Sequence, residues 1–255
     1  MTTGTGRPPP PMRHFGVLAH SHEGAALCFR TFCALGFAQL GDHQHPDVTL
    51  DCIAFGRSMA AWDAGDHDSV RATLAVSADR LARAGADFFA CPDNTAHLAL
   101  ERPGPDLRLP GLHIAEVVAD RAARDGRRKV GILGTRYTMD GPLYPRALAA
   151  RGIDAVAPPP LDRELVDRII FDELVAGILT ESSRRAYVSV VEDLAQRGCD
   201  AVALVCTEIP LLVTPEVSPL PTLDSTRLLA EAAFETAIGR RPLPGWRGGP
   251  LPTLL

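Results

Sequence analysis

Short apolar runs alternate with longer amphipathic stretches along most of this chain. The short runs have the length and composition of buried β-strands, and the longer stretches show helical spacing of their apolar residues. Because strand and helix alternate throughout, the pattern predicts an α/β fold with parallel sheets covered by helices. The predicted strands are 15–19, 48–55, 129–135 and 153–157, and the predicted helices are 25–40, 68–84 and 162–198, the last long enough for two helices.

One segment occurs twice. Residues 81–95 return as residues 194–208 at a constant offset of 113, without a gap, and the two copies share leucine, glycine and aspartate at matched positions. Each copy reads as a helix end, a glycine stop, a buried strand and a polar turn. The repeat places Asp93 and Cys206 at equivalent positions in two similar half-molecules. Two such groups, offered from two lobes, are suited to acid/base work on both faces of one carbon.

The first strand is repeated as well, since Gly16 and Gly131 lie in similar contexts 115 residues apart. We therefore expect two pseudo-symmetric, doubly wound lobes with the active site in the cleft between them. Lobe one is predicted to comprise 13–112 plus 222–240, where a capping residue, Asp224 or Ser225, begins a closing helix. Lobe two is predicted at 113–221.

The two ends of the chain lack these patterns. Residues 1–12 contain four consecutive prolines and are predicted to be a disordered tail. Residues 241–255, rich in proline and glycine, are predicted to be a flexible C-terminal tail. The N-terminus has no charged-then-apolar signal pattern, and no apolar run reaches the roughly 18 residues of a membrane span. We therefore expect a cytoplasmic protein without a membrane partner.

Composition narrows the function further. The chain has 255 residues, 46% of them hydrophobic, and a net charge of −5 without a basic block, which argues against a nucleic-acid partner. Its six cysteines show no Cys-x-x-Cys spacing, so reduced thiols are expected rather than disulfides. His43 and His45 lack further ligands at helical spacing, and neither a metal site nor a cofactor is predicted.

Cys206 is the first candidate for catalysis. It follows a wholly apolar strand, 201–205, and precedes Thr207, Glu208 and Pro210, which suit the first turn of a helix. A thiol at a helix N-terminus has a lowered pKa and a populated thiolate, which is both nucleophile and base. The alternative is that Cys206 is simply a small buried apolar residue.

Asp93 is the second candidate. It follows the apolar segment 88–92 and could act as general base or acid, although it could also simply cap the next helix. The usual aspartate pKa of about 3.9 makes it a poorer base than a thiolate, so burial would have to raise that pKa. Cys91 competes for the same role because it lies only two residues earlier, inside the strand.

Polar residues at the predicted strand ends and helix starts are candidates for binding substrate, because hydroxyl, amide and backbone N–H donors there can hold a carboxylate. Ordinary capping is the alternative for most of them, and packing is the alternative for the histidines. His22 and His97 are weaker candidates. The predicted substrate-binding residues are Asn94, Thr95, Thr207, Glu208, His20, Ser21, Ser58 and Thr135.

These motifs resemble the aspartate/glutamate racemase superfamily. Residues 92–97 read Pro-Asp-Asn-Thr-Ala-His, similar to a Pro-Cys-Asn-Thr-Ala-His motif of the first lobe, and residues 205–210 read Val-Cys-Thr-Glu-Ile-Pro, similar to a Gly-Cys-Thr-Glu-Ile-Pro motif of the second. The stretch 130–139 resembles a second-lobe strand and loop, and 168–177 resembles a helix of the aspartate racemase branch. The resemblance covers about residues 14–240.

The resemblance implies proton transfer at the carbon next to a carboxylate, without a cofactor, by two cysteines that flank that carbon. It also implies a homodimer. This chain departs from the pattern in three ways: Asp93 replaces the lobe-one cysteine, residues 19–24 replace a Gly-Gly-Met-Gly-Pro loop, and Ala176 stands where aspartate-specific members often have a lysine. The last difference disfavours plain aspartate or glutamate as substrate.

Three functions remain open at this point. The first is a racemase or epimerase of an amino acid or related small-molecule carboxylate, an isomerase of amino-acid metabolism with Asp93 and Cys206 on opposite faces of the substrate. The second is a decarboxylase or cis–trans isomerase that uses one thiol, which the loss of the lobe-one cysteine favours. The third is a binding paralogue without catalytic activity.

Overall fold

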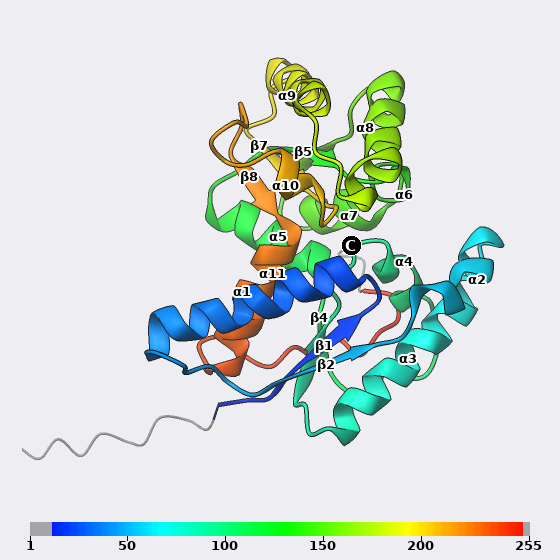
Figure 1. The fold of residues 1–255 in the computed structure, drawn as a ribbon, viewed down its shortest axis with the longest axis vertical. Helices are drawn as coiled ribbons and strands as arrows, with labels where there is room; N and C mark the ends of the chain where they lie inside the picture. Colours follow the sequence, from blue (N-terminus) through cyan, green and yellow to red (C-terminus); the bar gives the residue numbers. More distant parts are fainter. Residues whose placement is uncertain (1–11, 252–255) are drawn as a thin grey trace, which may run out of the picture.

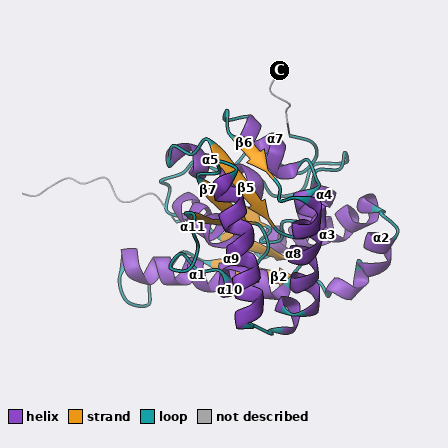
Figure 2. Ribbon diagram, turned by 90° about the horizontal axis from the view of Figure 1, so that it is seen from above, coloured by secondary structure: helices purple, strands orange, loops and turns teal. Residues whose placement is uncertain are grey.

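The protein consists of two halves, each built on a four-stranded parallel sheet, as the computed structural model shows for residues 12–251 (Figure 1). The strand orders, β2-β1-β3-β4 and β6-β5-β7-β8, are the same in both. Helices surround the strands in the view of Figure 2. The first sheet contains β1 (Phe15–Ala19), β2 (Val48–Cys52), β3 (Phe88–Ala90) and β4 (Gly111–Leu112). The second contains β5 (Lys129–Leu133), β6 (Asp154–Val156), β7 (Ala201–Leu204) and β8 (Thr222–Asp224).

The two sheets also share their register. Val17 of β1 pairs with Ala90 of β3, and Ile132 of β5 pairs with Ala203 of β7. These pairs are related by the two offsets found in the sequence, 115 for the first strand of each half and 113 for the third. The predicted α/β fold with two pseudo-symmetric lobes is therefore confirmed.

The helices of each half follow the predicted pattern, with the long stretch 162–198 divided into two helices by a 3₁₀ turn. Asp66 and Thr180 cap two of the longer helices by accepting hydrogen bonds from backbone N–H groups. Lobe one carries α1 (His22–Leu40), η1 (Phe55–Arg57), α2 (Met59–Asp63), α3 (His67–Arg83) and α4 (Ala96–Leu100). Lobe two carries α6 (Arg136–Met139), α7 (Leu143–Ala149), α8 (Pro160–Asp172), η2 (Leu174–Ala176), α9 (Glu181–Gln196) and α10 (Ile209–Leu212).

The glycine stops of the repeated segment have a conformational reason. Gly85 ends the turn after α3 with φ +95°, and Gly198 ends the turn after α9 with φ +88°. Residues with a side chain rarely adopt such positive φ values, whereas glycine does so at little cost. The two glycines therefore let each helix turn directly into the buried strand that leads to the candidate site.

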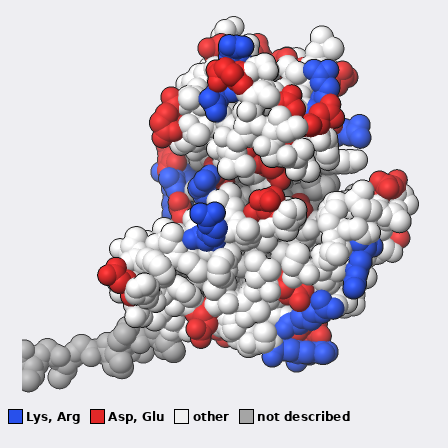
Figure 3. Space-filling model, in the orientation of Figure 1, with Lys and Arg blue, Asp and Glu red and all other residues white. Residues whose placement is uncertain are grey.

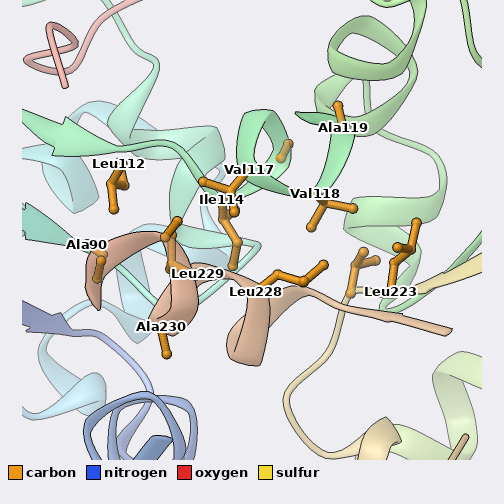
Figure 4. Close-up of a cluster of buried hydrophobic side chains, with 14 of the residues drawn as sticks. Ala90, Leu112, Ile114, Val117, Val118, Ala119, Leu223, Leu228, Leu229 and Ala230 are labelled. Atoms are coloured by element: carbon orange, nitrogen blue, oxygen red, sulfur yellow. The ribbon is translucent and has the colours of Figure 1, made fainter. Parts of the chain in front are cut away.

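One continuous apolar core joins the two halves. It is built around α5 (Ile114–Arg124) and α11 (Ser225–Ala237), which pack on each other between the sheets. In Figure 4, Ile114 and Val117 of α5 face Leu228 and Leu229 of α11. The same core includes residues of both sheets, so burial of this surface holds the lobes together as well as each lobe separately.

Two boundaries drawn from the sequence need correction. The segment 222–240 does not belong wholly to lobe one, because Thr222–Asp224 forms β8 and pairs with β7 at the edge of the second sheet. Residues 241–251 are not a loose tail. The carbonyls of Trp246 and Arg247 accept hydrogen bonds from the backbone N–H groups of Gly111 and Leu107, at 2.7 and 2.8 Å. The predicted disordered tail, apart from Met12, and residues 252–255 lie outside the described residues.

The surface carries both charge signs. On the face shown in Figure 3, Lys and Arg side chains alternate with Asp and Glu in small groups. Ion pairs among the described residues include that of Arg102 with Asp68 at 2.8 Å. Within residues 12–251, none of the helices combines the length and apolar character needed to cross a membrane.

Candidate active site

The two copies of the repeated segment end in loops that meet at the first turn of α1. A Cβ atom added to Gly24 of α1 would lie 2.3 Å from the Pro92 carbonyl oxygen of lobe one and 2.7 Å from the Thr207 Cγ2 atom of lobe two. Only glycine fits at such distances. The loops that carry Asp93 and Cys206 therefore approach each other closely, beyond the carboxyl ends of β3 and β7, where ligands bind in sheets of this kind.

The Asp93 carboxylate is almost buried, with 13% of its side chain exposed, and both oxygens accept hydrogen bonds. Oδ2 lies 2.7 Å from Nδ1 of His20, and Oδ1 accepts the Ala96 backbone N–H at 3.1 Å. Burial raises the pKa of Asp93, but its electrostatic interaction with His20 and the hydrogen bonds from His20 and the Ala96 N–H lower it, and the result lies below the usual range. Asp93 is thus ionised. Its pKa does not show the rise that a stronger base at this position would need.

His20 connects Asp93 to a residue that the sequence did not suggest. Its ring is 4% exposed, and its Nε2 atom accepts a hydrogen bond from Trp62 Nε1 of α2 at 3.2 Å. The ring also meets the edge of Phe55, with centroids 4.7 Å apart. His20 is thus almost buried and hydrogen-bonded to Asp93, which favours a supporting role for it over the predicted contact with substrate.

Cys206 differs from the prediction in its protonation. Its Sγ atom donates to the Glu208 carboxylate at 3.0 Å. Burial raises the pKa of Cys206 well above its usual value, and the charge and hydrogen bond of Glu208 raise it further. The predicted lowered pKa is wrong because α10 has only four residues and begins three residues later, so its dipole is weak at the thiol. Glu208 thus accepts the hydrogen bond of the thiol, and its contact with substrate stays a prediction.

Thr135 and Thr207 remain candidates for binding substrate. Thr135 follows β5, in the position that His20 has after β1, and its Oγ1 atom is buried without a hydrogen-bond partner among the described residues. Buried hydroxyls are rarely left unpaired, so a ligand oxygen is a natural partner. Thr207 is nearly buried beside Gly24. Thr95 is partly exposed at the start of α4, where its side chain makes no capping bond.

Asn94 joins the lobes. It is 4% exposed, its Nδ2 donates to Ser225 Oγ of α11 at 3.0 Å, and its Oδ1 accepts a hydrogen bond from the Tyr144 hydroxyl of α7. Ser225 and Tyr144 are themselves fully buried. Because both ends of its amide already have protein partners, the structure favours a structural role for Asn94 over the predicted contact with substrate.

The contacts of the remaining candidates favour structural roles. Ser21 caps α1 by accepting a weak hydrogen bond from the Gly24 N–H at 3.5 Å, and Ser58 is a buried residue at the start of α2. Cys91, two residues before Asp93 in the sequence, is fully buried. Burial together with the Asp93 charge raises the pKa of Cys91 well above the usual value. Cys91 is therefore poorly placed to replace Asp93.

His97 supports the Asp93 loop from behind. It is fully buried, its Nδ1 donates to the Asp93 carbonyl at 2.9 Å, and its Nε2 accepts the Ile114 N–H of α5 at 3.3 Å. Burial lowers the pKa of His97 to about 3 and the nearby His113 adds to the effect, so the ring is neutral. Within residues 12–251, no three His, Cys, Asp or Glu side chains are grouped as a metal site requires.

Comparisons with known proteins identify a family. The family model of the Asp/Glu/Hydantoin racemases matches residues 34–233. The broad-specificity amino-acid racemase RacX of Bacillus subtilis is 25% identical over 175 residues, which are 67% of this chain and 74% of RacX. A glutamate racemase of Thermus thermophilus is 35% identical over 155 residues, or 59% of this chain, but the match spans only 55% of that enzyme.

Solved structures show the same fold. A Yersinia pestis protein assigned as an Asp/Glu racemase superimposes with a TM-score of 0.80 and 33% identity, over 89% of this chain and 100% of that one. An aspartate racemase homologue from Pyrococcus horikoshii gives a TM-score of 0.74 and 25% identity, over 89% of this chain and 99% of that one.

Proposed function

Because the chain belongs to the Asp/Glu/hydantoin racemase family, we propose that it is a racemase or epimerase that works without a cofactor. Its substrate is an amino acid or a related carboxylate, and the reaction is proton exchange at the α-carbon. Relatives named as amino-acid racemases, which are isomerases, support this class of reaction.

The main support for the proposal is that two equivalent residues have opposite roles in their hydrogen bonds, one as acceptor and the other as donor. Asp93 accepts hydrogen bonds at both carboxylate oxygens, whereas Cys206 donates its proton to Glu208. The resting protein therefore holds a base on lobe one and an acid on lobe two. This is the protonation required to remove a proton from one face of a carbon and to return one to the other.

In the proposed reaction, an Asp93 oxygen takes the α-proton and the electron pair of the C–H bond moves into the substrate carboxylate, forming an enolate-like dianion. The Cys206 thiol then gives its proton to the opposite face of the carbon, which inverts the configuration. Thr95, Thr135 and Thr207 are proposed to hold the substrate carboxylate as its charge grows. Asp93 then releases the proton it took to solvent, and the Cys206 thiolate, which Glu208 repels, takes a proton from solvent, so the resting protonation is restored.

The substrate side chain is proposed to lack a second carboxylate. The resemblance places a lysine that pairs with such a group at residue 176, and this chain has an exposed alanine there, at the end of η2. Neutral or apolar α-substituents are therefore preferred over those of aspartate and glutamate.

The experiment is solvent exchange in D₂O with both enantiomers of a panel of amino acids and α-substituted carboxylates. Deuterium at the α-carbon together with the appearance of the opposite configuration supports the proposal. Exchange with strict retention of configuration contradicts it. The matched control is Cys206→Ser, which should abolish inversion because a hydroxyl is a much weaker acid at that position.

A second candidate is a decarboxylase or cis–trans isomerase that needs only Cys206. The lowered pKa of Asp93 favours it, since a weak base on lobe one suits a reaction in which only the thiol gives or takes a proton. Product analysis with malonate-type and maleate-type substrates separates the two candidates. The homodimer implied by the resemblance belongs to the same proposal, and light scattering on the purified protein tests it.

A further inference from the structure

We propose that Trp62 and His20 are positioning residues for Asp93: the indole N–H fixes the tautomer of His20, and His20 in turn directs an N–H at the Asp93 carboxylate. The inference rests on the proposed role of Asp93 as the lobe-one base. It concerns a hydrogen-bonded chain of three side chains from three separate segments, the end of β1, the helix α2 and the loop after β3.

The direction of these hydrogen bonds, from donor to acceptor, follows from the donors available. An indole nitrogen can only donate, so the 3.2 Å contact from Trp62 Nε1 requires a lone pair on His20 Nε2. A neutral imidazole with its lone pair on Nε2 carries its proton on Nδ1, which faces Asp93 Oδ2 at 2.7 Å. His20 is therefore a donor to Asp93, and the carboxylate is held in its ionised, proton-accepting form.

The surroundings fix the ring of His20 in this orientation. Its plane is nearly perpendicular to the rings of Phe55 and Trp62, at 78° and 75°, with the Phe55 centroid 4.7 Å away. Trp62 is supported on its other side by His67 of α3, at 5.1 Å between centroids. The segment 55–63 thus lies against His20, and its placement is coupled to Asp93.

The described residues of lobe two contain no counterpart to these three hydrogen-bonded side chains. The residue equivalent to His20 is Thr135, whose side-chain oxygen has no hydrogen-bond partner in the described part of the protein. The residue equivalent to Asp93 is Cys206, and its partner is the carboxylate Glu208, an acceptor. Each lobe therefore supplies the partner that its own group needs, a donor for the carboxylate and an acceptor for the thiol.

The hydrogen bonds from Trp62 to His20 and from His20 to Asp93 also affect proton transfer. Other titratable groups that face Asp93 are His97 from α4, the adjacent Cys91 and Cys206 from lobe two. Among the residues that the structure describes, only His20 donates from a side chain to the carboxylate itself, so its tautomer decides whether Asp93 meets a donor or a lone pair. A lone pair on Nδ1 would repel the carboxylate and turn it away from its present position.

The test is the tautomer of His20, read from the ring ¹⁵N signals of histidine-labelled protein. The His20 signals are assigned by their loss in His20→Asn. We expect the Nδ1–H form in the wild type and a mixture of tautomers in Trp62→Phe, which keeps an aromatic ring but lacks the indole N–H. Trp246→Phe is the control, because Trp246 makes no hydrogen bond to His20 and should leave its signals unchanged. An Nε2–H form in the wild type, or no change in Trp62→Phe, overturns the proposal.

Turnover gives the second readout, using the substrate found by solvent exchange. Trp62→Phe should lower kcat by roughly three- to tenfold with little change in KM, the size expected for one lost hydrogen bond. His20→Asn should retain more activity than His20→Gln, because the asparagine amide nitrogen takes the place of Nδ1. Equal rates for these two variants contradict the role of the donor. The tautomer can be measured without any activity, so failure of the proposed function is distinguishable from failure of this inference.

Discussion

The thiol of Cys206 lies 3.0 Å from the Glu208 carboxylate, two residues further along the same loop, and donates its proton to it. The negative charge of Glu208 adds to burial in raising the pKa of Cys206. Glu208→Gln removes that charge and leaves a side chain of the same shape. We expect the variant to have a lower Cys206 pKa and therefore faster alkylation by iodoacetamide at pH 7 to 8.

Alkylation should be followed for each cysteine by peptide mass spectrometry, because Cys33 is half-buried and Cys52 is exposed. Cys52 lies in β2 of lobe one, whereas Cys206 follows β7 of lobe two, and Cys52 serves as the internal reference. A Cys206 rate that is unchanged or lower in Glu208→Gln, relative to Cys52, would show that Glu208 does not control the thiol.

Replacing Asp93 with asparagine tests the lobe-one base. The amide keeps the size of the side chain but cannot take a proton, and we expect turnover to fall by about 10²- to 10⁴-fold. The substrate found by solvent exchange should still bind, so KM should change much less than kcat. Asp93→Cys restores the residue that the family motif has here and should recover part of the activity. Wild-type turnover in Asp93→Ala would exclude a role for this carboxylate in catalysis.

Much of this site could be predicted from the sequence because strand ends are encoded locally. The repeat around Gly85 and Gly198 identified the two loops, and the alternation of apolar and polar segments identified the fold. The sequence did not reveal the direction of the Cys206 pKa shift. That shift depends on how deeply the thiol is buried and on where the Glu208 carboxylate points, and neither is a property of residue spacing.

The partners that the sequence missed are distant along the chain or lie in segments without periodicity. Trp62 is 42 residues from His20, and its short helix gives no amphipathic signal. The C-terminal segment 241–251 has the composition of a loose tail, but its backbone carbonyls bond to β4 and to the loop before it. Backbone hydrogen bonds of this kind depend little on residue type, so composition alone could not predict them.

The hydrogen bond from Tyr144 to Asn94 should contribute to the stability of the whole molecule, since it links α7 of lobe two to the Asp93 loop. Tyr144→Phe keeps the buried ring but leaves Asn94 Oδ1 without its donor. We expect the free energy of unfolding to fall by about 1–3 kcal/mol, the cost of an unpaired buried polar atom. Urea denaturation measures it. Tyr137→Phe, at a largely exposed ring, is the control and should change stability by much less.

His97 should make the protein sensitive to acid. Its folded pKa of about 3 lies below the ordinary value of 6.5, so between these two values the unfolded chain binds a proton that the folded protein does not. The stabilisation from the neutral ring is therefore complete above pH 6.5 and is lost progressively as the pH falls towards 3. Between pH 7 and 5 we expect a loss of about 2 kcal/mol in the free energy of unfolding.

Urea denaturation at pH 7 and pH 5 tests this directly. His97→Gln should be less stable than the wild type at pH 7, because the glutamine amide does not place its nitrogen and its oxygen where Nδ1 and Nε2 meet the Asp93 carbonyl and the Ile114 N–H. Its stability should nevertheless change less between the two pH values, since glutamine does not titrate. Replacement of the exposed His43 by glutamine should leave the wild-type dependence intact. A wild type that is equally stable at pH 7 and pH 5 would mean that the buried ring accepts a proton in the folded state, and that His97 does not hold the Asp93 loop in the manner described.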